Sequence, residues 1–195
     1  MDILSALGRT VPFAFASGIN LYATVAVLGL CSRFNLVALP DQFRAFDNSL
    51  VITAAVALYL LEFVADKIPW VDSVWDVVHT VVRPLGGALV AVTTLGAASP
   101  RAEVLTALLG ASVAMTTHLT KAGTRAAANT SPEPFSNWFL SFIEDAFVIG
   151  LGALALKYPA AAAVVVLVCL VLIVAFASWI IRAVRRWLVQ RTAAP

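Results

Sequence analysis

Four ionisable side chains recur at helical spacing within the valine-rich stretch 71–83. They are Asp72, Asp76, His79 and Arg83, at positions i, i+4, i+7 and i+11. On a helix that turns about 100° per residue, the four fall within roughly 60° of one another, and apolar side chains cover most of the remaining circumference. Carboxylates beside an imidazole and a guanidinium on one stripe can bind an ion, relay protons or form internal ion pairs.

Two placements of this helix are open on the sequence alone. It could lie flat at a membrane interface with the charged stripe toward water, or it could begin a transmembrane helix with the stripe toward the bundle interior. Interfacial helices usually carry a wide, lysine-rich polar face, whereas this face is narrow and mostly acidic. The sequence therefore favours the buried stripe, in which His79 is either a proton relay or a hydrogen-bonded structural residue.

A second polar stripe follows the first along the chain. A shift of 65 residues aligns Pro69 with Pro134, Asp72 with Asn137, Asp76 with Ser141, His79 with Glu144, Thr80 with Asp145, and Gly87 with Gly152. Both copies would cross in the same direction, which predicts a parallel internal repeat. A competing alignment of residues 17–23 with 122–128 predicts two inverted halves, with helix breaks near Gly18 and Gly123.

The acidic side chains need basic partners if they are buried, because an unpaired charge in lipid costs several kcal/mol. Arg125 is either a loop residue or the partner of Glu62, Glu144 or Asp145. Glu62 could equally be a charge at the end of its helix. Glu144 and Asp145 are adjacent, so only one is expected to point squarely inward, and Glu144 shares a face with Asn137.

Metal and enzyme chemistry are not expected. Asp76 and His79, three residues apart, resemble half of a carboxylate-bridged metal site, but the second copy has Ser141 and Glu144 at these positions. The sequence contains no glycine-rich phosphate loop ending in Lys-Ser or Lys-Thr, no G-x-S-x-G and no H-E-x-x-H. We therefore predict no metal, no cofactor and no catalytic activity.

The composition indicates that membrane helices position these side chains. Hydrophobic residues make up 61% of the 195 residues and charged residues 12%, whereas soluble domains carry about 25% charged residues. The net charge of +2 does not favour a nucleic-acid partner. We predict one all-α integral-membrane domain over residues 1–195, a polytopic helix bundle with the lipid bilayer as its partner and homo-oligomerisation left open.

About six segments are long and apolar enough to cross a bilayer. They cover approximately residues 11–32, 49–65, 71–98, 101–121, 135–157 and 160–181, and a basic tail follows over 182–195. With this topology, nine Lys and Arg residues lie on the side of the C-terminal arginines and four on the other side. This bias predicts a multi-pass protein with both termini cytoplasmic.

Two segments resemble a known family. "LEFVADKIPWVDSVWDVVHTVVRPLGGAL" and "HLTKAGTRAAANTSPEPFSNWFLSFIED" are similar to an uncharacterised bacterial integral-membrane family, domain of unknown function 4126. The patterns D-K-x-P, H-x-x-x-R-P and S-P-E-P-x-S-N carry the resemblance, which extends from about Ser17 to Pro159. It implies an all-helical protein of the bacterial inner membrane and assigns no role to any residue.

These observations predict a small transporter or channel-like protein with a polar intramembrane site. The expected site residues are Asp72, Asp76, His79, Arg83, Asn137, Ser141, Glu144, Asp145, Glu62 and Arg125. The ligand could be an ion, a proton-coupled small solute or a lipid headgroup. The alternative is a non-catalytic membrane scaffold or assembly subunit, in which the same charges form structural pairs.

Overall fold

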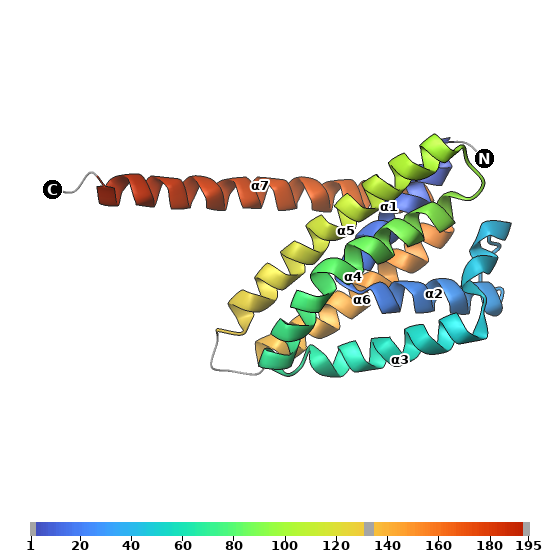
Figure 1. Cartoon of the computed structure of the whole chain (residues 1–195), viewed down its shortest axis with the longest axis horizontal. Helices are drawn as coiled ribbons and strands as arrows, with labels where there is room; N and C mark the ends of the chain where they lie inside the picture. The colour runs from blue at the N-terminus through green and yellow to red at the C-terminus, as the bar shows by residue number, and fades with distance from the viewer. Residues whose placement is uncertain (1–2, 131–134, 193–195) are drawn as a thin grey trace. The chain divides into compact units, whose positions relative to one another are not determined.

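The computed structural model describes residues 3–130 and 135–192, which form helices joined by short turns and loops (Figure 1). In chain order the elements are α1 (Ile3–Ile19), α2 (Leu21–Arg33), the short 3-10 helix η1 (Asp41–Phe46), α3 (Ser49–Ala65), α4 (Pro69–Leu95), α5 (Pro100–Ala128), α6 (Phe135–Lys157) and α7 (Pro159–Thr192). The chain divides into two compact units, residues 1–163 and 164–195, where the sequence predicted one domain.

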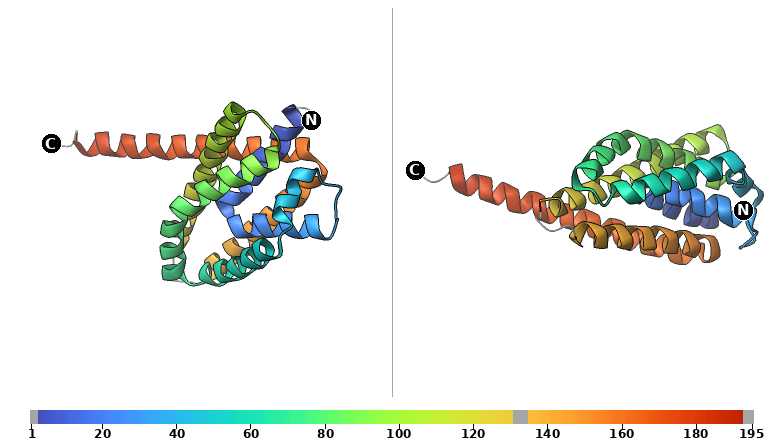
Figure 2. Two further views of the ribbon diagram at one scale, coloured as in Figure 1. Left: turned by 45° about the vertical axis from the view of Figure 1, so that its right-hand side comes forward. Right: turned by 90° about the horizontal axis from the view of Figure 1, so that it is seen from below.

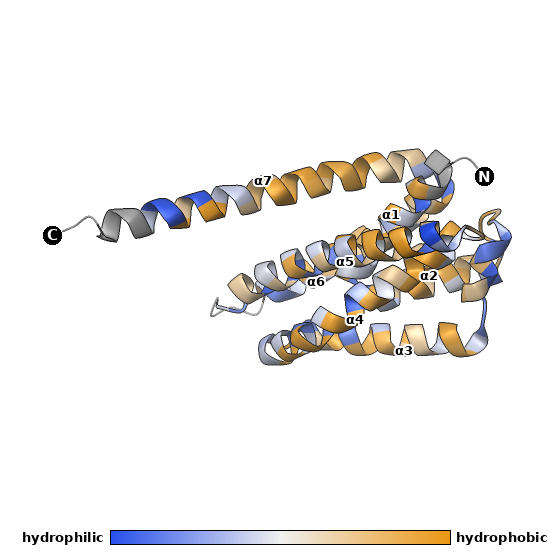
Figure 3. Cartoon of the chain, turned by 45° about the horizontal axis from the view of Figure 1, so that its top comes forward, coloured by the Kyte–Doolittle hydropathy of each residue, from blue (hydrophilic) through white to orange (hydrophobic). Residues whose placement is uncertain are grey.

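Among the described residues, four helices are long and apolar enough to cross a bilayer: α4, α5, α6 and the Pro159–Trp187 part of α7. The apolar helices α2 and α3 are shorter, at 13 and 17 residues. Colouring by hydropathy shows that α7 is apolar over most of its length and hydrophilic toward its C-terminal end (Figure 3). The chain is therefore an all-helical, multi-pass membrane protein.

The span predicted over 11–32 is wrong as a single helix, because the chain leaves helical geometry at Asn20, with φ −148° and ψ 99°. The Asn20 side chain accepts a hydrogen bond from the backbone N–H of Ala23, with 2.9 Å between the two heavy atoms. Asparagine is a favoured N-cap for this reason, so α1 ends and α2 begins here. Of the two breaks that the inverted alignment predicted, the one near Gly18 lies two residues from Asn20. The one near Gly123 is wrong, since α5 continues through Gly123 to Ala128.

The other predicted bounds need smaller corrections. The ranges of α3 and α6 coincide with the predicted spans 49–65 and 135–157. α4 covers Pro69–Leu95, where the prediction was 71–98. α5 continues to Ala128, beyond the predicted end at 121, and α7 continues to Thr192, beyond the predicted end at 181. Residues 182–192 thus continue a helix, so the basic tail predicted over 182–195 is not a separate segment. Residues 193–195 lie outside the described residues.

Within residues 1–163, α1 packs against α4, α5 and α6, while α2 and α3 run side by side (Figures 1 and 2). Glycines allow α4 and α5 to approach closely. A Cβ atom added at Gly87 would lie 2.4 Å from Ala114 Cβ, and one added at Gly110 would lie 2.5 Å from Ala91 Cβ. Small residues permit this backbone approach between membrane helices. The close packing places the polar stripe of α4 next to α5.

The proposed parallel repeat stays a prediction. Both α4 and α6 carry an inward-facing polar stripe, and α4 begins at Pro69 as the alignment expects. Its counterpart Pro134 lies outside the described residues, so the start of the second copy is not described.

Candidate functional site

The charged stripe of α4 points into the protein. Asp72, Asp76, His79 and Arg83 are 0%, 7%, 2% and 0% exposed, whereas Val77 on the opposite face is 73% exposed. A flat interfacial helix with its charges toward water is therefore excluded. The apolar valines form the outer surface of α4, as a helix surrounded by lipid requires.

The stripe of α6 is buried as well. Asn137, Ser141 and Asp145 are at most 6% exposed, and the Glu144 side chain is 15% exposed. The expectation that only Glu144 would point inward is wrong, because Asp145 is the more deeply buried of the two. Glu144 still reaches Arg125 from a less central position, since its side chain is one methylene longer.

The first half of the charged cluster joins α3, α4 and α5. Arg83 Nη2 lies 2.6 Å from Glu62 Oε1, and Lys121 Nζ lies 3.2 Å from the same oxygen. Arg83 Nη1 also lies 3.6 Å from Asp76 Oδ1. All four side chains are less than 10% exposed. Glu62 is therefore an internal partner of two cations, not an end charge in water.

The second half of the cluster joins α5 to α6 and to the end of α3. Arg125 Nη2 lies 2.8 Å from Glu144 Oε2 and 3.0 Å from Asp66 Oδ2. Lys121 Nζ lies 3.1 Å from Asp66 Oδ2 and 3.5 Å from Glu144 Oε2. Because Lys121 also contacts Glu62, it links the two halves of the cluster. Arg125 is thus a buried ion-pair partner and not a loop residue, but of the three acids expected to pair with it, only Glu144 does.

The helix break adds oriented backbone groups to the cluster. Arg83 Nη1 donates to the carbonyl of Gly18, and Lys121 Nζ donates to the carbonyl of Ile19, each over 3.3 Å. These carbonyls end α1, where the helix carries partial negative charge. Next to them, Asn20 Nδ2 donates to Asp145 Oδ1 over 3.1 Å. Cations thus meet the negative end of α1, and an acid lies beside the residue that caps the positive end of α2.

The geometry around His79 defines its protonated nitrogen. Its Nδ1 lies 2.7 Å from the carbonyl oxygen of Trp75, which can only accept, so Nδ1 carries the hydrogen. Its Nε2 lies 3.0 Å from the Tyr22 hydroxyl, which donates to it when the imidazole is neutral. The direct partners of His79 are a backbone carbonyl and a tyrosine, so it does not relay protons between two contacting carboxylates.

His118 is constrained in a complementary way. Arg83 Nη1 lies 2.9 Å from His118 Nδ1, and a guanidinium can only donate, so this nitrogen is unprotonated. The hydrogen is then on Nε2, which lies 3.0 Å from the Thr80 hydroxyl. The neutral His118 is therefore an acceptor for Arg83 and part of the site, although it is not among the site residues expected from the sequence.

An asparagine connects the two polar stripes. Asn129 Nδ2 donates to Asp72 Oδ2 over 3.0 Å, and Asn129 Oδ1 accepts from Asn137 Nδ2 over 2.5 Å. The first residues of both stripes are therefore bridged by the residue that follows α5. Together, these contacts bring all ten predicted site residues into one cluster or its immediate border.

Sequence reasoning missed Asp66, Lys121 and Asn20 as site residues. Asp66 follows Glu62 by four positions, and Lys121 precedes Arg125 by four. Residues spaced i and i+4 share one helix face, so an acidic pair on one helix and a basic pair on another are a detectable signal for facing charges. The signal for Asn20 is weaker: the inverted alignment predicted a break near Gly18, and asparagine is a favoured N-cap, but neither feature predicts contacts with the charged side chains.

Lys67 lies at the border of the cluster, in the turn between α3 and α4. Its ammonium is 3.0 Å from the centre of the Phe63 ring and 4.9 Å from that of Phe142, and it donates to Ser141 Oγ over 3.3 Å. Partial burial lowers the pKa of Lys67, and attraction to Asp145 opposes this shift. Lys67 thus links α3 and α6 through cation–π contacts with one phenylalanine on each helix.

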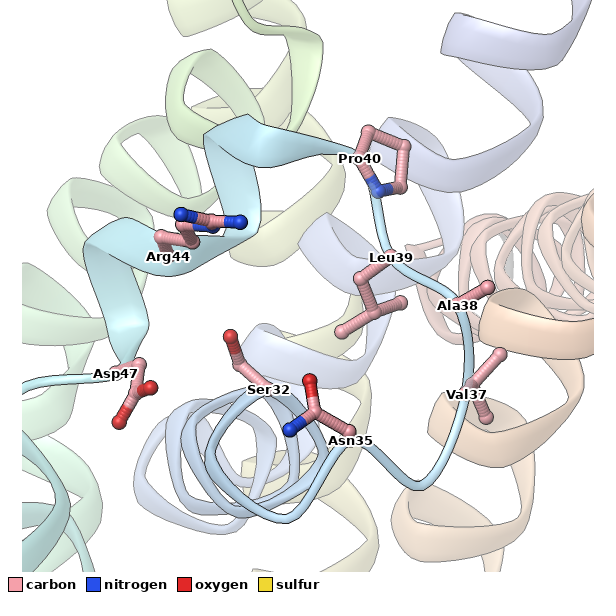
Figure 4. A pocket seen from close by; sticks show the side chains of 8 residues that line it. All are labelled: Ser32, Asn35, Val37, Ala38, Leu39, Pro40, Arg44 and Asp47. Carbon is pink, nitrogen blue, oxygen red and sulfur yellow. The ribbon is translucent and has the colours of Figure 1, made fainter.

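The described residues do not present a metal centre: among them, no three His, Cys, Asp or Glu side chains are arranged to hold a metal ion. A surface pocket lies elsewhere, in the loop after α2 (Figure 4). Its lining residues are Ser32, Asn35, Val37, Ala38, Leu39, Pro40, Arg44 and Asp47. None of the predicted site residues is among them, so the charged cluster is the candidate site.

Fold and site together define a multi-pass helical membrane protein with a buried charged cluster at a helix break. The profile of a family described as a domain of unknown function, DUF4126, matches residues 7–179, and the chain belongs to this family. The match is longer at both ends than the resemblance seen from residue 17 to 159. No curated protein and no solved structure matches the chain.

Proposed function

We propose that this protein is a small transporter or channel-like protein whose polar intramembrane site is the charged cluster around the α1–α2 break. One observation carries the proposal: buried side chains of both signs converge on the ends of two half-helices. Charges at membrane depth are expensive and usually serve function, and discontinuous helices commonly form the binding sites of transporters.

The proposed topology has five crossings, α3 to α7, instead of the six predicted from the sequence. α1 and α2 do not cross together, because Thr10 of α1 and Gln42 of η1, which follows α2, both contact Thr94 at the same end of α4. α3, with 17 residues, is at the lower limit for a span. The excess of Lys and Arg on the side of the C-terminal arginines predicts a cytoplasmic C-terminus in an inner membrane. Five crossings then put the N-terminus on the opposite side, instead of in the cytoplasm as the sequence predicted. The α1–α2 pair would enter the membrane from one side and return to it, which brings Asn20 to a depth at which irregular backbone occurs only beside protein or a polar cavity.

The proposed ligand class is an ion, a proton-coupled small solute or a lipid headgroup. The cluster offers carboxylates, guanidinium groups and carbonyl oxygens, which recognise charge without needing a cofactor. No enzymatic step is part of the proposal. A homo-oligomer is compatible with it, since the site is built within residues 1–163.

A second candidate function is a membrane scaffold or assembly subunit. It is favoured by the complete pairing of Arg83, Lys121 and Arg125, each of which contacts at least two carboxylates. Buried pairs of this kind can fix helix register without binding any ligand. The two candidates differ in whether water and solutes reach the cluster.

Solvent access and flux discriminate between them. Asp72→Cys and Ser141→Cys would each be introduced into protein in which the free Cys31 and Cys169 are replaced by serine, with the outward-facing Val77→Cys as a control. A membrane-impermeant thiol reagent that labels positions 72 and 141, but not 77, from the cytoplasmic side supports a cavity. Unlabelled positions 72 and 141, together with no solute or proton flux in proteoliposomes, would favour the scaffold.

A further inference from the structure

Two of the six acids in the cluster differ from the others in their partners. Glu62, Asp66, Asp76 and Glu144 each lie within 4.0 Å of a Lys or Arg nitrogen. Among the described residues, Asp72 and Asp145 have no such partner, and each accepts a hydrogen bond from one asparagine instead. An amide donor compensates a buried carboxylate less than a cation does.

The charges of the cluster do not balance when every group is ionised. Its six acids face the buried bases Arg83, Lys121 and Arg125, and Lys67 at the border supplies a fourth base. Two negative charges are therefore left uncompensated in a low-dielectric interior, where such charges are strongly unfavourable. Protonation of a carboxyl that lacks a cationic partner removes this imbalance most directly.

Asp145 is the better candidate of the two. Asp72 lies in the first turn of α4, where the helix N-terminus stabilises a negative charge. Asp145 lies midway along α6 and has no such support. Its Oδ1 accepts from Asn20. Burial does not separate the two acids, since Asp72 is 0% and Asp145 6% exposed, so the position relative to the helix N-terminus distinguishes them.

We propose that Asp145 is a proton-binding site, which takes up and releases one proton at the break between α1 and α2. A proton suits this position better than a metal ion. The Asn20 oxygen is already engaged with the N–H of Ala23, and its amide nitrogen is a donor, so one carboxylate is left to act as a ligand. Lys67 and Lys121 act on the same carboxylate and would repel a second cation. A proton needs only one oxygen.

The groups that face Asp145 come from every element around it. They are Tyr59 and Glu62 of α3, Asp66 at the end of α3, Lys67 of the following turn, Lys121 of α5, and Asn20 between α1 and α2. The acids favour the protonated form of Asp145, and the lysines favour the ionised form. The Tyr59 hydroxyl lies beside the carboxyl, where its O–H can donate to the ionised form and its oxygen can accept from the protonated form.

Proton uptake would act on the helix break. Asn20 donates to Asp145, and a hydrogen bond to a carboxylate is stronger than one to a neutral carboxyl group. Protonation therefore weakens the contact between α6 and the residue that caps α2. Coupling of this step to movement of a solute rests on the proposed function, whereas the proton site itself does not.

Infrared difference spectroscopy of the purified full-length protein tests the site. The protonated carboxyl of Asp145 should give a C=O stretching band that grows as the pH is lowered and that is lost in Asp145→Asn. The band should persist in Asp72→Asn and in Asp41→Asn, which alters an exposed carboxylate. A pH-dependent band that is unchanged in a folded Asp145→Asn protein, or that is lost in Asp72→Asn, overturns the proposal.

Wild-type protein provides a test that does not depend on the stability of a variant. A hydrophobic carbodiimide reacts with protonated buried carboxyls, and peptide mass spectrometry distinguishes Asp145 from its neighbour Glu144. Modification should increase at Asp145 as the pH falls, and modification of Glu144 alone contradicts the proposal. Protonation of Asp145 without any solute or proton flux would support the proton site and count against the transport function. Flux without protonation of Asp145 would support the transport function and overturn the proton site.

Discussion

Arg83 of α4 and Glu62 of α3 form the shortest ion pair among the described residues, with 2.6 Å between Nη2 and Oε1 and both side chains 0% exposed. A residue in the middle of α4 and one near the C-terminal end of α3 are thus joined in the interior of a strongly apolar protein. A buried pair of this kind tolerates loss of both charges better than loss of one, because a single substitution leaves its partner uncompensated.

Arg83→Gln is therefore expected to destabilise the protein by about 3–5 kcal/mol. The double variant Glu62→Gln/Arg83→Gln should lose less than the sum of the two single variants, with a coupling of about 0.5–3 kcal/mol. The free energy of unfolding in detergent, measured for wild type, both single variants and the double variant, gives this coupling as a double-mutant cycle. Strictly additive effects would show that the pair contributes no direct interaction.

Arg125→Ala should be far more destabilising than Arg101→Ala. Arg125 is buried between Asp66 and Glu144, so its removal is expected to cost about 3–5 kcal/mol. Arg101 is exposed in the first turn of α5, and its removal should change stability by about 0.5 kcal/mol or less. The midpoints of thermal unfolding in detergent compare the two, and equal midpoints would remove Arg125 from the internal network.

The two faces of α4 should respond oppositely to a change in charge. Val78 is 55% exposed on the outer face, so Val78→Asp places a carboxylate against lipid at a cost of about 2.5–3.5 kcal/mol and should lower the yield of inserted protein. Asp76→Asn keeps the shape and hydrogen-bonding capacity of the buried residue, so it should preserve the yield while changing any flux. Comparable yields of wild type and Val78→Asp would contradict the lipid-facing surface.

Two glycines form a matched pair that tests the end of α1. A Cβ atom at Gly18 would lie 1.8 Å from Thr117 Oγ1 and 2.3 Å from the Ala114 carbonyl oxygen, whereas one at Gly123 would meet nothing within 4 Å. Gly18→Ala should therefore destabilise by about 1–3 kcal/mol. Gly123→Ala should be neutral or stabilise by about 0.5–1 kcal/mol, because it lowers backbone freedom in a helix. Thermal unfolding measures the change in stability of both variants. A Gly18→Ala protein as stable as wild type would argue against the close contact of α1 with α5.

The topology can be measured independently of stability. A reporter fusion at the C-terminus is expected in the cytoplasm, because Arg182, Arg185 and Arg186 follow the most apolar part of α7. Fusions at the N-terminus and in the loop after α2 should both report the other side of the membrane, since Thr10 and Gln42 contact the same end of α4. Both termini on one side would require an even number of crossings and would contradict the five proposed.

The sequence by itself determined the features that depend on local periodicity and composition. The charges of α4 fall on one face because a helix turns about 100° per residue, whatever surrounds it. The low content of charged residues likewise predicted membrane helices before any contact was known. The inward direction of both stripes follows from the same physics, since lipid excludes charges from the outer face.

Tertiary structure alone decided which charges meet and which of two sequence interpretations, one continuous span or a break near Gly18, holds for the first helix. Arg125 pairs with Asp66 and Glu144 instead of Glu62 because the distance between helices, and not spacing along the chain, selects partners. Asn20 interrupts an apolar run that hydropathy describes as one span. The break is stabilised by its cap on α2 and by contacts from Arg83, Lys121 and Asp145, which lie on three other helices. Such contacts between distant residues leave no periodic signal in the sequence, so only the packed structure shows them.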